Sequence, residues 1–342
     1  MATMIAGLCR LLKGRIFLPA DPKTSLENKT VLITGGNTGL GLEAAVKYVN
    51  LGAATVIIGC RDIDRGIQAK STIEAHTHRL AVVQVWPLDL NRYESVVAFS
   101  DRINREFSRL DVVLLNAGAL HRQYNLSPEG WENTIQTNTL STVLLALLLL
   151  PKLRQSHSDS GPAHLTFTSS STHKFVQEGQ LVGSECEKIL EHINQESTFA
   201  GRRQYNVSKI LLEFAVKSIA QTTRRENGTL DVIVNSASPG FCSTSLNREY
   251  DSFIERFFNR IFYTIFGRSA EQGSRTLVSA TLLGEESHGR CWMHDTYPDM
   301  SQYLVSTVQG KELQRKAWKE IINELMHQLP SRETMICIKE PR

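Results

Sequence analysis

The sequence of 342 residues predicts an α/β protein, a single doubly wound domain with a parallel sheet of about seven strands. Two observations support this prediction. Short β-rich runs alternate with amphipathic stretches over the first 240 residues, and a glycine-rich turn joins the first run to the first helix. No linker or repeat divides the chain, and an apolar content of 41% is enough for a full core.

The strand candidates are short apolar runs rich in β-branched residues. They are Thr30–Thr34, Thr55–Gly59, Ala81–Pro87, Asp111–Asn116, His164–Thr168 and Asp231–Ala237. Between them, helical patterns occupy Leu40–Leu51, Arg92–Phe107, Trp131–Arg154 and Gln204–Arg224. Strands that alternate with helices of this length form βαβ units, whose right-handed crossovers place helices on both faces of the sheet.

The domain spans residues 28–300, between an N-terminal arm and a C-terminal tail. The arm, residues 1–27, is apolar with three basic residues near its middle. Its charge-free runs are too short to cross a bilayer, and the basic residues interrupt the core that a signal peptide needs. We expect it to pack on the domain, and the alternative is a position on a membrane surface. In the tail, residues 301–342, the spacing over Lys311–Leu329 predicts an amphipathic helix that ends before Pro330.

Charge and cysteine content exclude several classes of protein. The net charge is +3 with the basic residues dispersed, so there is no electrostatic footprint for nucleic acid. The six cysteines form no Cys-x-x-Cys pair, which predicts reduced thiols and no metal site. The apolar run Leu140–Leu150 lies among Thr, Ser and Asn residues and is expected to be a buried helix. We expect a cytoplasmic protein, peripheral to an intracellular membrane only if the arm lies on one.

A glycine-rich turn marks the candidate nucleotide site. The strand Thr30–Thr34 runs directly into Gly35-Gly36-Asn37-Thr38-Gly39-Leu40-Gly41 and then into a helix. Glycines let the backbone approach a pyrophosphate, whose charge is met by the N-terminus of the helix. A glycine-rich turn alone is weak support, but the strand before it and the helix after it favour a dinucleotide site. The spacing differs from the commoner G-x-G-x-x-G.

Tyr205 and Lys209 place a phenol and an ammonium one helical turn apart. Residues i and i+4 share a face of a helix, so the two side chains can act together. A cation held close favours a phenolate and lowers the pKa of a phenol from its ordinary value of about 10. The pair is therefore a candidate acid-base device, although a surface tyrosine beside a solvated lysine has the same spacing.

Several motifs in order resemble the short-chain dehydrogenase/reductase family. They are Thr34-Gly35-x3-Gly39-x-Gly41, Asn116-Ala117-Gly118, Asn138, a Ser-Ser pair, Tyr205-x3-Lys209 and Pro239-Gly240. The resemblance covers about residues 28–290 and implies a Rossmann fold. Within the family, the sequence is most similar to retinol-dehydrogenase-like enzymes and fungal secondary-metabolism reductases. That closer similarity rests on Cys60-Arg61-Asp62, Asp89-Leu90, Asn116-Ala117-Gly118-Ala119 and Arg268-Ser269-Ala270-Glu271-Gln272-Gly273.

The resemblance implies a catalytic tetrad. Tyr205 matches the general acid-base, and Lys209 matches the lysine that assists it and binds the nicotinamide ribose. Ser170 matches the serine that orients the substrate, with Ser169 or Ser171 as the alternatives if the register slips. Asn138 matches the asparagine that distorts its helix and anchors a proton-relay water. These roles predict hydride transfer between a nicotinamide and a carbonyl or alcohol.

The end of the second strand bears on the choice of cofactor. Arginine at this position accommodates the 2′-phosphate of NADP, whereas an acidic residue holds the ribose of NAD. Arg61 stands twenty residues past Gly41 and is followed by Asp62, so we expect NADP (NADPH), with NAD as the less favoured alternative. The resemblance places the following residues against the cofactor: Gly35, Asn37, Thr38, Gly39, Leu40, Gly41, Arg61, Asp89, Asn116, Ala117, Gly118, Tyr205, Lys209, Pro239, Gly240 and Thr244.

Two segments are expected to shape the substrate pocket. Ser170 and Tyr205 are 35 residues apart, so residues 174–203 form an insert that we expect to be a mobile wall of the pocket. Aromatic residues are dense between Tyr250 and Phe266, and the family places a substrate lid at residues 245–267. An apolar lid favours a lipophilic substrate that is polyketide-, steroid- or retinoid-like. Packing of these aromatics on the body, a partner or a membrane is an equal alternative.

The sequence as a whole predicts an NADP(H)-dependent oxidoreductase that acts on a lipophilic small molecule, with secondary metabolism as a candidate pathway. A non-catalytic NADP-binding regulator on the same fold is the first alternative, and a sugar-nucleotide epimerase is the second. The resemblance also implies that a homodimer would form through the helices predicted at Trp131–Arg154 and Gln204–Arg224.

Overall fold

Seven parallel strands form one sheet in the order β3-β2-β1-β4-β5-β6-β7. The strands are β1 (Thr30–Thr34), β2 (Thr55–Cys60), β3 (Val83–Pro87), β4 (Val112–Leu115), β5 (Ala163–Thr168), β6 (Val232–Ala237) and β7 (Cys291–Trp292). The computed structural model describes residues 18–157, 161–183, 187–225, 227–242 and 267–328. The predicted fold class, a doubly wound α/β domain, is confirmed.

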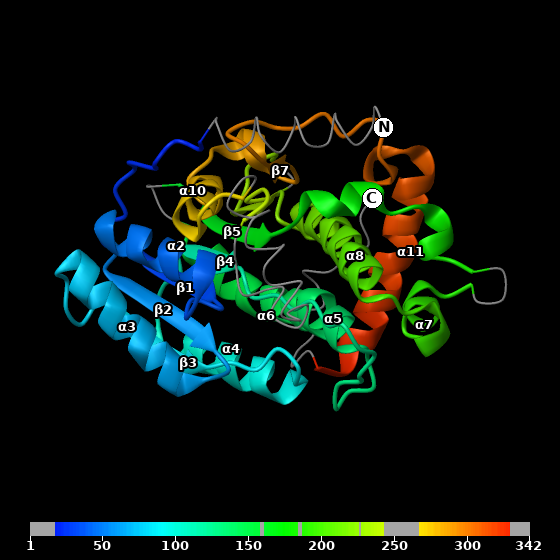
Figure 1. Ribbon diagram of the computed structural model, residues 1–342. Coiled ribbons are helices and arrows are strands. Elements are labelled where there is room, and N and C mark those ends of the chain that lie inside the picture. Colours follow the sequence, from blue (N-terminus) through cyan, green and yellow to red (C-terminus); the bar gives the residue numbers. More distant parts are fainter. Residues whose placement is uncertain (1–17, 158–160, 184–186, 226, 243–266, 329–342) are drawn as a thin grey trace.

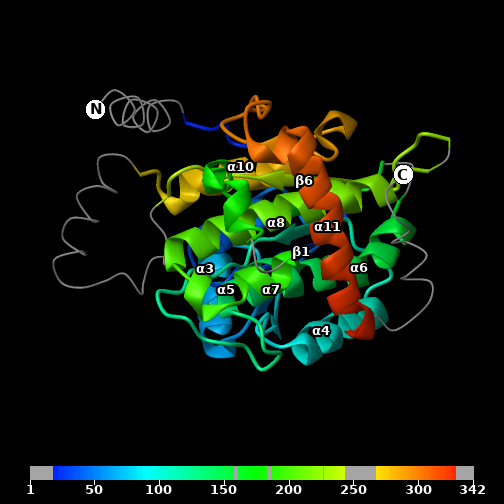
Figure 2. The same cartoon turned by 90° about the vertical axis from the view of Figure 1, so that its right-hand side faces the viewer.

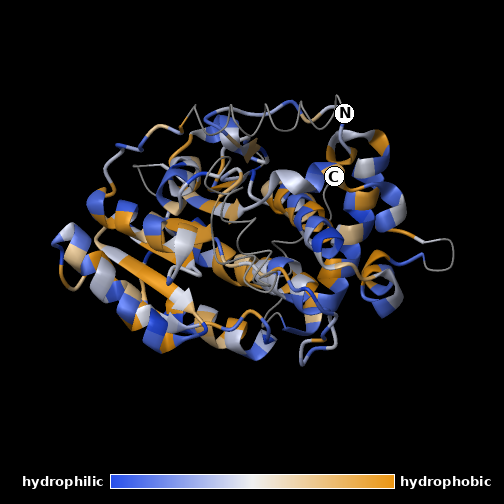
Figure 3. Ribbon diagram, in the orientation of Figure 1, coloured by the Kyte–Doolittle hydropathy of each residue, from blue (hydrophilic) through white to orange (hydrophobic). Residues whose placement is uncertain are grey.

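Helices cover both faces of this sheet (Figure 1). On one face lie α2 (Gly39–Asn50), α3 (Ile63–Thr77) and α10 (Ala270–Ala280), and on the other lie α4 (Tyr93–Glu106), α6 (Ser141–Gln155) and α8 (Gly201–Thr222). Successive strand side chains point to opposite faces, so Val31 and Ile33 join one core cluster and Leu32 joins the other. Because both faces of the sheet are buried, β2 is apolar along most of its length, as Figure 3 shows.

Strand β7, helices α3 and α10, and the short helix at Ile189–Ile193 were not among the predicted elements. Strand β7 has two residues, too few to show a period in the sequence. Helix α3 buries Gly66, Ala69 and Ile73, so its inner face is made mostly of small residues and lacks a strong apolar pattern.

The most apolar helix is a core helix. The segment Asn133–Gln155 is long and apolar enough to cross a membrane by composition, but 89% of its most apolar window is buried inside the fold. Residues 144–150 are each at most 4% exposed. The prediction that Leu140–Leu150 forms a buried helix is therefore confirmed.

A C-terminal helix covers the edge formed by α8. Helix α11 (Val308–Leu325) confirms the predicted tail helix and crosses α8 in Figure 2. Gln314 on α11 donates a hydrogen bond to Ser218 on α8 at 3.1 Å. The short helix α7 (Ile189–Ile193) of the insert packs beside α11, and Glu320 accepts hydrogen bonds from the backbone N–H groups at its start.

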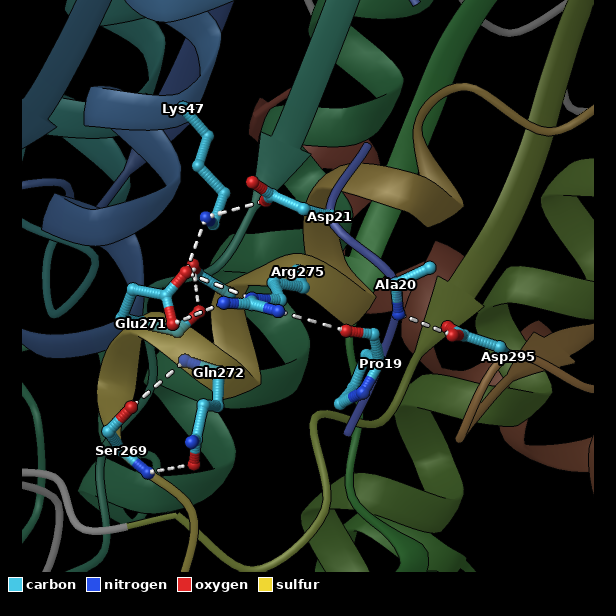
Figure 4. A network of polar contacts seen from close by, with 10 residues as sticks. Pro19, Ala20, Asp21, Lys47, Ser269, Glu271, Gln272, Arg275 and Asp295 are labelled. Carbon is cyan, nitrogen blue, oxygen red and sulfur yellow. Dashed lines mark hydrogen bonds and ion pairs between the residues drawn. The ribbon is translucent and has the colours of Figure 1, made fainter. Parts of the chain in front are cut away.

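The described end of the N-terminal arm is tied to the domain by polar contacts (Figure 4). The backbone N–H of Ala20 donates to Asp295 at 2.7 Å, and Asp21 pairs with Lys47 of α2 at 2.9 Å. Lys47 also pairs with Glu271 of α10 at 2.7 Å. From residue 18 onward the arm thus packs on the domain, while the question of a membrane contact concerns residues that lie outside the described part of the chain.

Candidate functional site

A cavity of about 810 Å³ lies at the carboxyl ends of the central strands. Strands β1 and β4 are neighbours in the sheet although β2 and β3 separate them in sequence, so the winding direction reverses between them. Open parallel sheets bind ligands in the crevice outside such a reversal. Predicted site residues that line the cavity are Gly35, Asn37, Thr38, Gly39, Leu40, Gly41, Arg61, Asp89, Asn116, Ala117, Gly118, Ser170, Tyr205, Lys209, Pro239 and Gly240.

The glycine turn after β1 has the shape that a pyrophosphate requires. Gly35 and Gly39 have φ of 67° and 54°, in the left-handed region that favours glycine. A Cβ at Gly41 would lie 2.3 Å from the carbonyl oxygen of Gly35, so only glycine fits there. Because α2 begins at Gly39, its N-terminal N–H groups face the cavity. These residues fit a dinucleotide.

Thr34 fixes the two strand ends that frame this turn. Its Oγ1 accepts hydrogen bonds from the backbone N–H groups of Asn116 and Ala117, both at 2.9 Å. The side-chain amide of Asn116 in turn donates to the carbonyl oxygen of Thr34 at 3.0 Å. The Asn116-Ala117-Gly118 segment is thereby held beside the glycine turn, where both segments line the same cavity.

Helix α8 carries Tyr205 and Lys209 into the cavity. The predicted spacing holds, and Lys209 Nζ lies 5.7 Å from the centre of the Tyr205 ring. Lys209 is 3% exposed, and its ammonium donates to the carbonyl oxygen of Thr168, at the end of β5, at 2.7 Å. Burial lowers the pKa of Lys209 to about 8, an effect that the charge of Glu213 opposes. The ammonium is therefore still mostly charged at neutral pH.

Asn138 lies behind the cavity in a distorted helical turn. Residues Gln136–Leu140 form a π-helical turn between α5 (Asn133–Ile135) and α6, as the resemblance implies. The Asn138 side chain accepts from the N–H of Ala119 at 2.7 Å and donates to Ser208 Oγ at 2.9 Å. A Cβ at Gly118 would lie 3.3 Å from Asn138 Oδ1 and 3.8 Å from Lys209 Nζ. Asn138 and Lys209 thus both lie on the side of Gly118 where a side chain would project.

Of the three candidate serines after β5, the cavity is lined by Ser169 and Ser170. Ser170 is half-buried and its Oγ accepts a hydrogen bond from Thr172 Oγ1 at 3.0 Å. Ser169 is 2% exposed, and its hydroxyl is enclosed without a hydrogen-bond partner. Ser171 uses its backbone N–H to bond Ser238 and does not line the cavity. Of the three, Ser170 thus lines the cavity without having its hydroxyl enclosed.

The carboxylate of Asp62, the acidic residue after β2, makes structural contacts with Arg65. One Asp62 oxygen accepts the N–H of Arg65 at 3.0 Å and so caps α3, and the other lies 3.3 Å from Arg65 Nε. Arg61, Asp62 and Arg65 all line the cavity rim. The carboxylate that complicated the cofactor prediction therefore has two local partners, and two guanidinium groups stand beside it.

The Pro239-Gly240 segment after β6 closes the other end of the cavity. Gly240 has φ of 81°, and a Cβ there would lie 3.2 Å from His294 and 3.3 Å from the guanidinium of Arg268. Arg268 is 2% exposed, and its backbone N–H donates to the carbonyl oxygen of Phe241 at 2.8 Å. Thr244 and the predicted lid, apart from Gly267, lie outside the described residues.

Several cavity residues were missed by the sequence analysis. They are Arg65, Asn91, Leu120, His121, Asn133, Thr137, Thr172, Arg202, Asn206, Phe241 and Cys242, among others. Arg202 had a signal, because it precedes Tyr205 by three residues and shares its helix face. His121 lies on an irregular segment with no period to reveal it, and Asn133 is the first residue of α5, inside the helix predicted at Trp131–Arg154.

The insert predicted at residues 174–203 as a mobile wall of the pocket reaches the cavity at one end, and its mobility stays a prediction. Within the described part of residues 174–203, Arg202 is the residue that lines the cavity. Elsewhere in the insert, Glu320 of α11 caps α7, and Asn194 accepts the backbone N–H of Glu132 at 2.7 Å. The insert is bound to α11 and to the loop before α5, and both contacts are distant in sequence.

The described cysteines and acidic residues fit this picture. Cys60, Cys242 and Cys291 are free thiols, as predicted. Burial raises the pKa of Cys60 to about 11 and that of Cys242 to about 12, so both are neutral thiols. Among the described residues, no three His, Cys, Asp or Glu side chains are placed to hold a metal ion.

Comparison with solved structures shows the fold. The NADP active-site complex of RhlG from Pseudomonas aeruginosa is similar with a TM-score of 0.60 at 20% identity, over 80% of this chain and 97% of that one. An uncharacterized protein from Mycobacterium paratuberculosis gives a TM-score of 0.63 at 23% identity, over 90% and 97% of the two chains.

Comparison of sequences goes further. A family model described as short chain dehydrogenase matches residues 29–180. Short-chain dehydrogenase/reductase ffsI of Aspergillus flavipes is 41% identical over 93% of this chain and 92% of that protein. Short-chain dehydrogenase/reductase phmF of Phaeosphaeria nodorum is 40% identical over 90% and 89%. With this fold, this cavity and identity of that level along nearly its whole length, the chain belongs to the short-chain dehydrogenase/reductase family.

Proposed function

We propose that the protein is an NADP(H)-dependent oxidoreductase that interconverts a carbonyl and an alcohol on a lipophilic, polyketide-like small molecule in secondary metabolism. The observation that carries the proposal is the shared cavity, which is lined by Ser170, Tyr205, Lys209 and the glycine turn. A nucleotide-binding regulator needs the turn alone. A reaction also needs an acid-base group beside the nucleotide, and Tyr205 with Lys209 provides one.

The residues would act as follows during carbonyl reduction. NADPH, when bound, supplies the hydride for the carbonyl carbon. Ser170 and Tyr205 donate hydrogen bonds to the carbonyl oxygen, and Tyr205 transfers its phenolic proton to that oxygen as negative charge develops. The Lys209 ammonium stabilises the phenolate that remains. In alcohol oxidation the same phenolate accepts the hydroxyl proton.

The preference for NADP rests on the rim of the cavity. Arg61 and Arg65 provide two guanidinium groups, which suit a 2′-phosphate. The Asp62 carboxylate already accepts the N–H of Arg65 and pairs with its guanidinium, so a ribose hydroxyl would compete with these two contacts. A similar fold with NADP in its active site, that of RhlG, supports the proposal.

The lipophilic substrate rests on the aromatic residues between Tyr250 and Phe266, which lie outside the described residues. The described lining near Tyr205 is more polar, with His121, Asn133 and Arg202 beside Leu120 and Phe241. We therefore propose a substrate whose reacting carbonyl carries neighbouring polar groups, as polyketide-derived ketones do.

The test is NADPH oxidation by the purified protein across a panel of aromatic and aliphatic ketones. In Tyr205→Phe, we expect kcat to fall by about 10²–10⁴-fold, because the proton donor is lost. NADPH binding, measured by fluorescence titration, should change little. Retention of full activity by Tyr205→Phe would refute the acid-base role, and NADPH binding without turnover of any ketone would favour a regulator.

A further inference from the structure

Glu213 is a buried acid that the reaction scheme above does not use. It lies on α8, one helical turn beyond Lys209, and is 4% exposed. Ser236 on β6 donates a hydrogen bond to its Oε1 at 2.8 Å. Acidic side chains are almost never this buried without a compensating charge. The position of Glu213 therefore calls for a partner.

Two lysines on the same helix face provide that charge. Lys209 and Lys217 lie four residues before and four residues after Glu213, on the same face of α8, and the charge of Glu213 raises the pKa of both against the effect of burial. Each ammonium donates to a neutral backbone carbonyl, Lys209 to Thr168 at 2.7 Å and Lys217 to Val305 at 2.8 Å. A carbonyl satisfies the hydrogen bond but leaves the positive charge uncompensated.

Other titratable groups that face this cluster are neutral or farther away. His173 is 2% exposed, and burial lowers its pKa, so it is neutral at neutral pH. Burial raises the pKa of Cys291, which is a neutral thiol. Lys174 acts on His173 and Cys291, and Lys311 of α11 acts on Lys217. Among the described residues, the carboxylate of Glu213 is thus the negative charge that acts on both the buried Lys209 and the half-buried Lys217.

We propose that Glu213 is a positioning residue for the proton-transfer site: its carboxylate keeps the buried Lys209 ammonium charged, and Lys217 competes for the same carboxylate. Only the expected effect of Glu213 on turnover rests on the proposed function. The ionisation of Lys209 itself can be followed without turnover, so the two can fail separately.

The substitution Glu213→Gln tests the charge with little change of shape, because the amide oxygen can still accept the bond from Ser236. Removing the negative charge disfavours the ammonium, so the midpoint of Lys209 titration should fall by about one pH unit. The midpoint is measured by competitive acetylation with acetic anhydride, followed by mass spectrometry of the peptide that contains Lys209. In Glu213→Asp, which keeps the negative charge, the midpoint of Lys209 should stay close to the wild-type value.

The substitution Lys217→Gln is the matched variant. It removes the competing cation, so the midpoint of Lys209 should rise. A misfolded protein would not produce shifts of opposite sign from two neighbouring positions on one helix. Thermal unfolding of both variants should be cooperative.

Turnover gives the second readout. Carbonyl reduction needs a charged Lys209, so kcat should decline as the pH rises through the lysine pKa, and this alkaline limb should move to lower pH in Glu213→Gln. An unmoved Lys209 midpoint in both variants would overturn the inference, whatever the activity. If the wild-type protein reduces no ketone but the midpoints shift as expected, the inference stands and the proposed function fails.

Discussion

At the scale of single residues, the contacts of Asp62 bear on a question that the sequence leaves open, the choice between NADP and NAD. An arginine followed by an aspartate after the second strand is ambiguous, because either residue can reach the adenosine ribose. The structure gives the carboxylate two local partners, the backbone N–H and the guanidinium of Arg65. Arg61 has no such role in capping α3 and lines the cavity. The sequence could not show this, since it does not reveal where a helix cap begins.

We therefore predict that Arg61→Ala raises the KM for NADPH by about tenfold or more, the loss expected for one charge-assisted contact to a phosphate. The KM for NADH should change much less, because NADH has no 2′-phosphate. Steady-state kinetics with both nucleotides measures the ratio. Equal effects on the two nucleotides would refute the preference for NADP.

Asp62→Asn is the control for this prediction. Asparagine caps helices about as well as aspartate, so stability should be retained. If Asp62 binds no ribose, the KM for NADH should be unchanged in Asp62→Asn. A selective rise in that KM would show that the carboxylate serves NAD instead.

At the scale of elements, local spacing predicted α8 and its active side chains but did not predict the insert. The i, i+4 relation of Tyr205 and Lys209 follows from helix geometry alone, and the helix extends over Gly201–Thr222, close to the predicted range. The position of α7 depends on its contact with α11, which lies far along the chain. Glu320 caps Leu190 across 130 residues, and no periodicity within the insert encodes that contact.

This contact gives a prediction for the insert. Glu320→Ala removes the acceptor of two backbone N–H groups, those of Ile189 and Leu190, at 3.0 and 2.8 Å. Loss of a helix cap of this kind costs about 0.5–2 kcal/mol, so the free energy of unfolding in urea should fall by about that amount. Because α7 does not line the cavity, kcat and KM should be unchanged under conditions in which the variant is fully folded.

Glu312→Ala is the matched control, since Glu312 is exposed on the same helix. Its effect on the free energy of unfolding should lie within about ±0.5 kcal/mol, as for most surface substitutions. A change in substrate KM in Glu320→Ala without loss of stability would support the expectation that the insert is a wall of the pocket.

At the scale of the whole molecule, the helices expected to form a dimer interface are covered within one chain. Helix α6 is buried nearly all round, and α11 lies along α8. The far end of α11 reaches the start of α4, where Glu324 accepts hydrogen bonds from Trp131 at 2.8 Å and Tyr93 at 3.4 Å. A helix that is already covered offers no apolar face to a second subunit.

We therefore predict that the protein is a monomer of 38.3 kDa in solution, as measured by sedimentation velocity at micromolar concentration. Trp318 of α11 is 4% exposed and belongs to the core cluster that includes α8. Trp318→Ala should cost about 3–5 kcal/mol of unfolding free energy and loosen this cover, so that association then rises with protein concentration. A stable wild-type dimer would contradict the prediction. If that dimer persists unchanged in Trp318→Ala, its interface lies elsewhere than on α8 and α11.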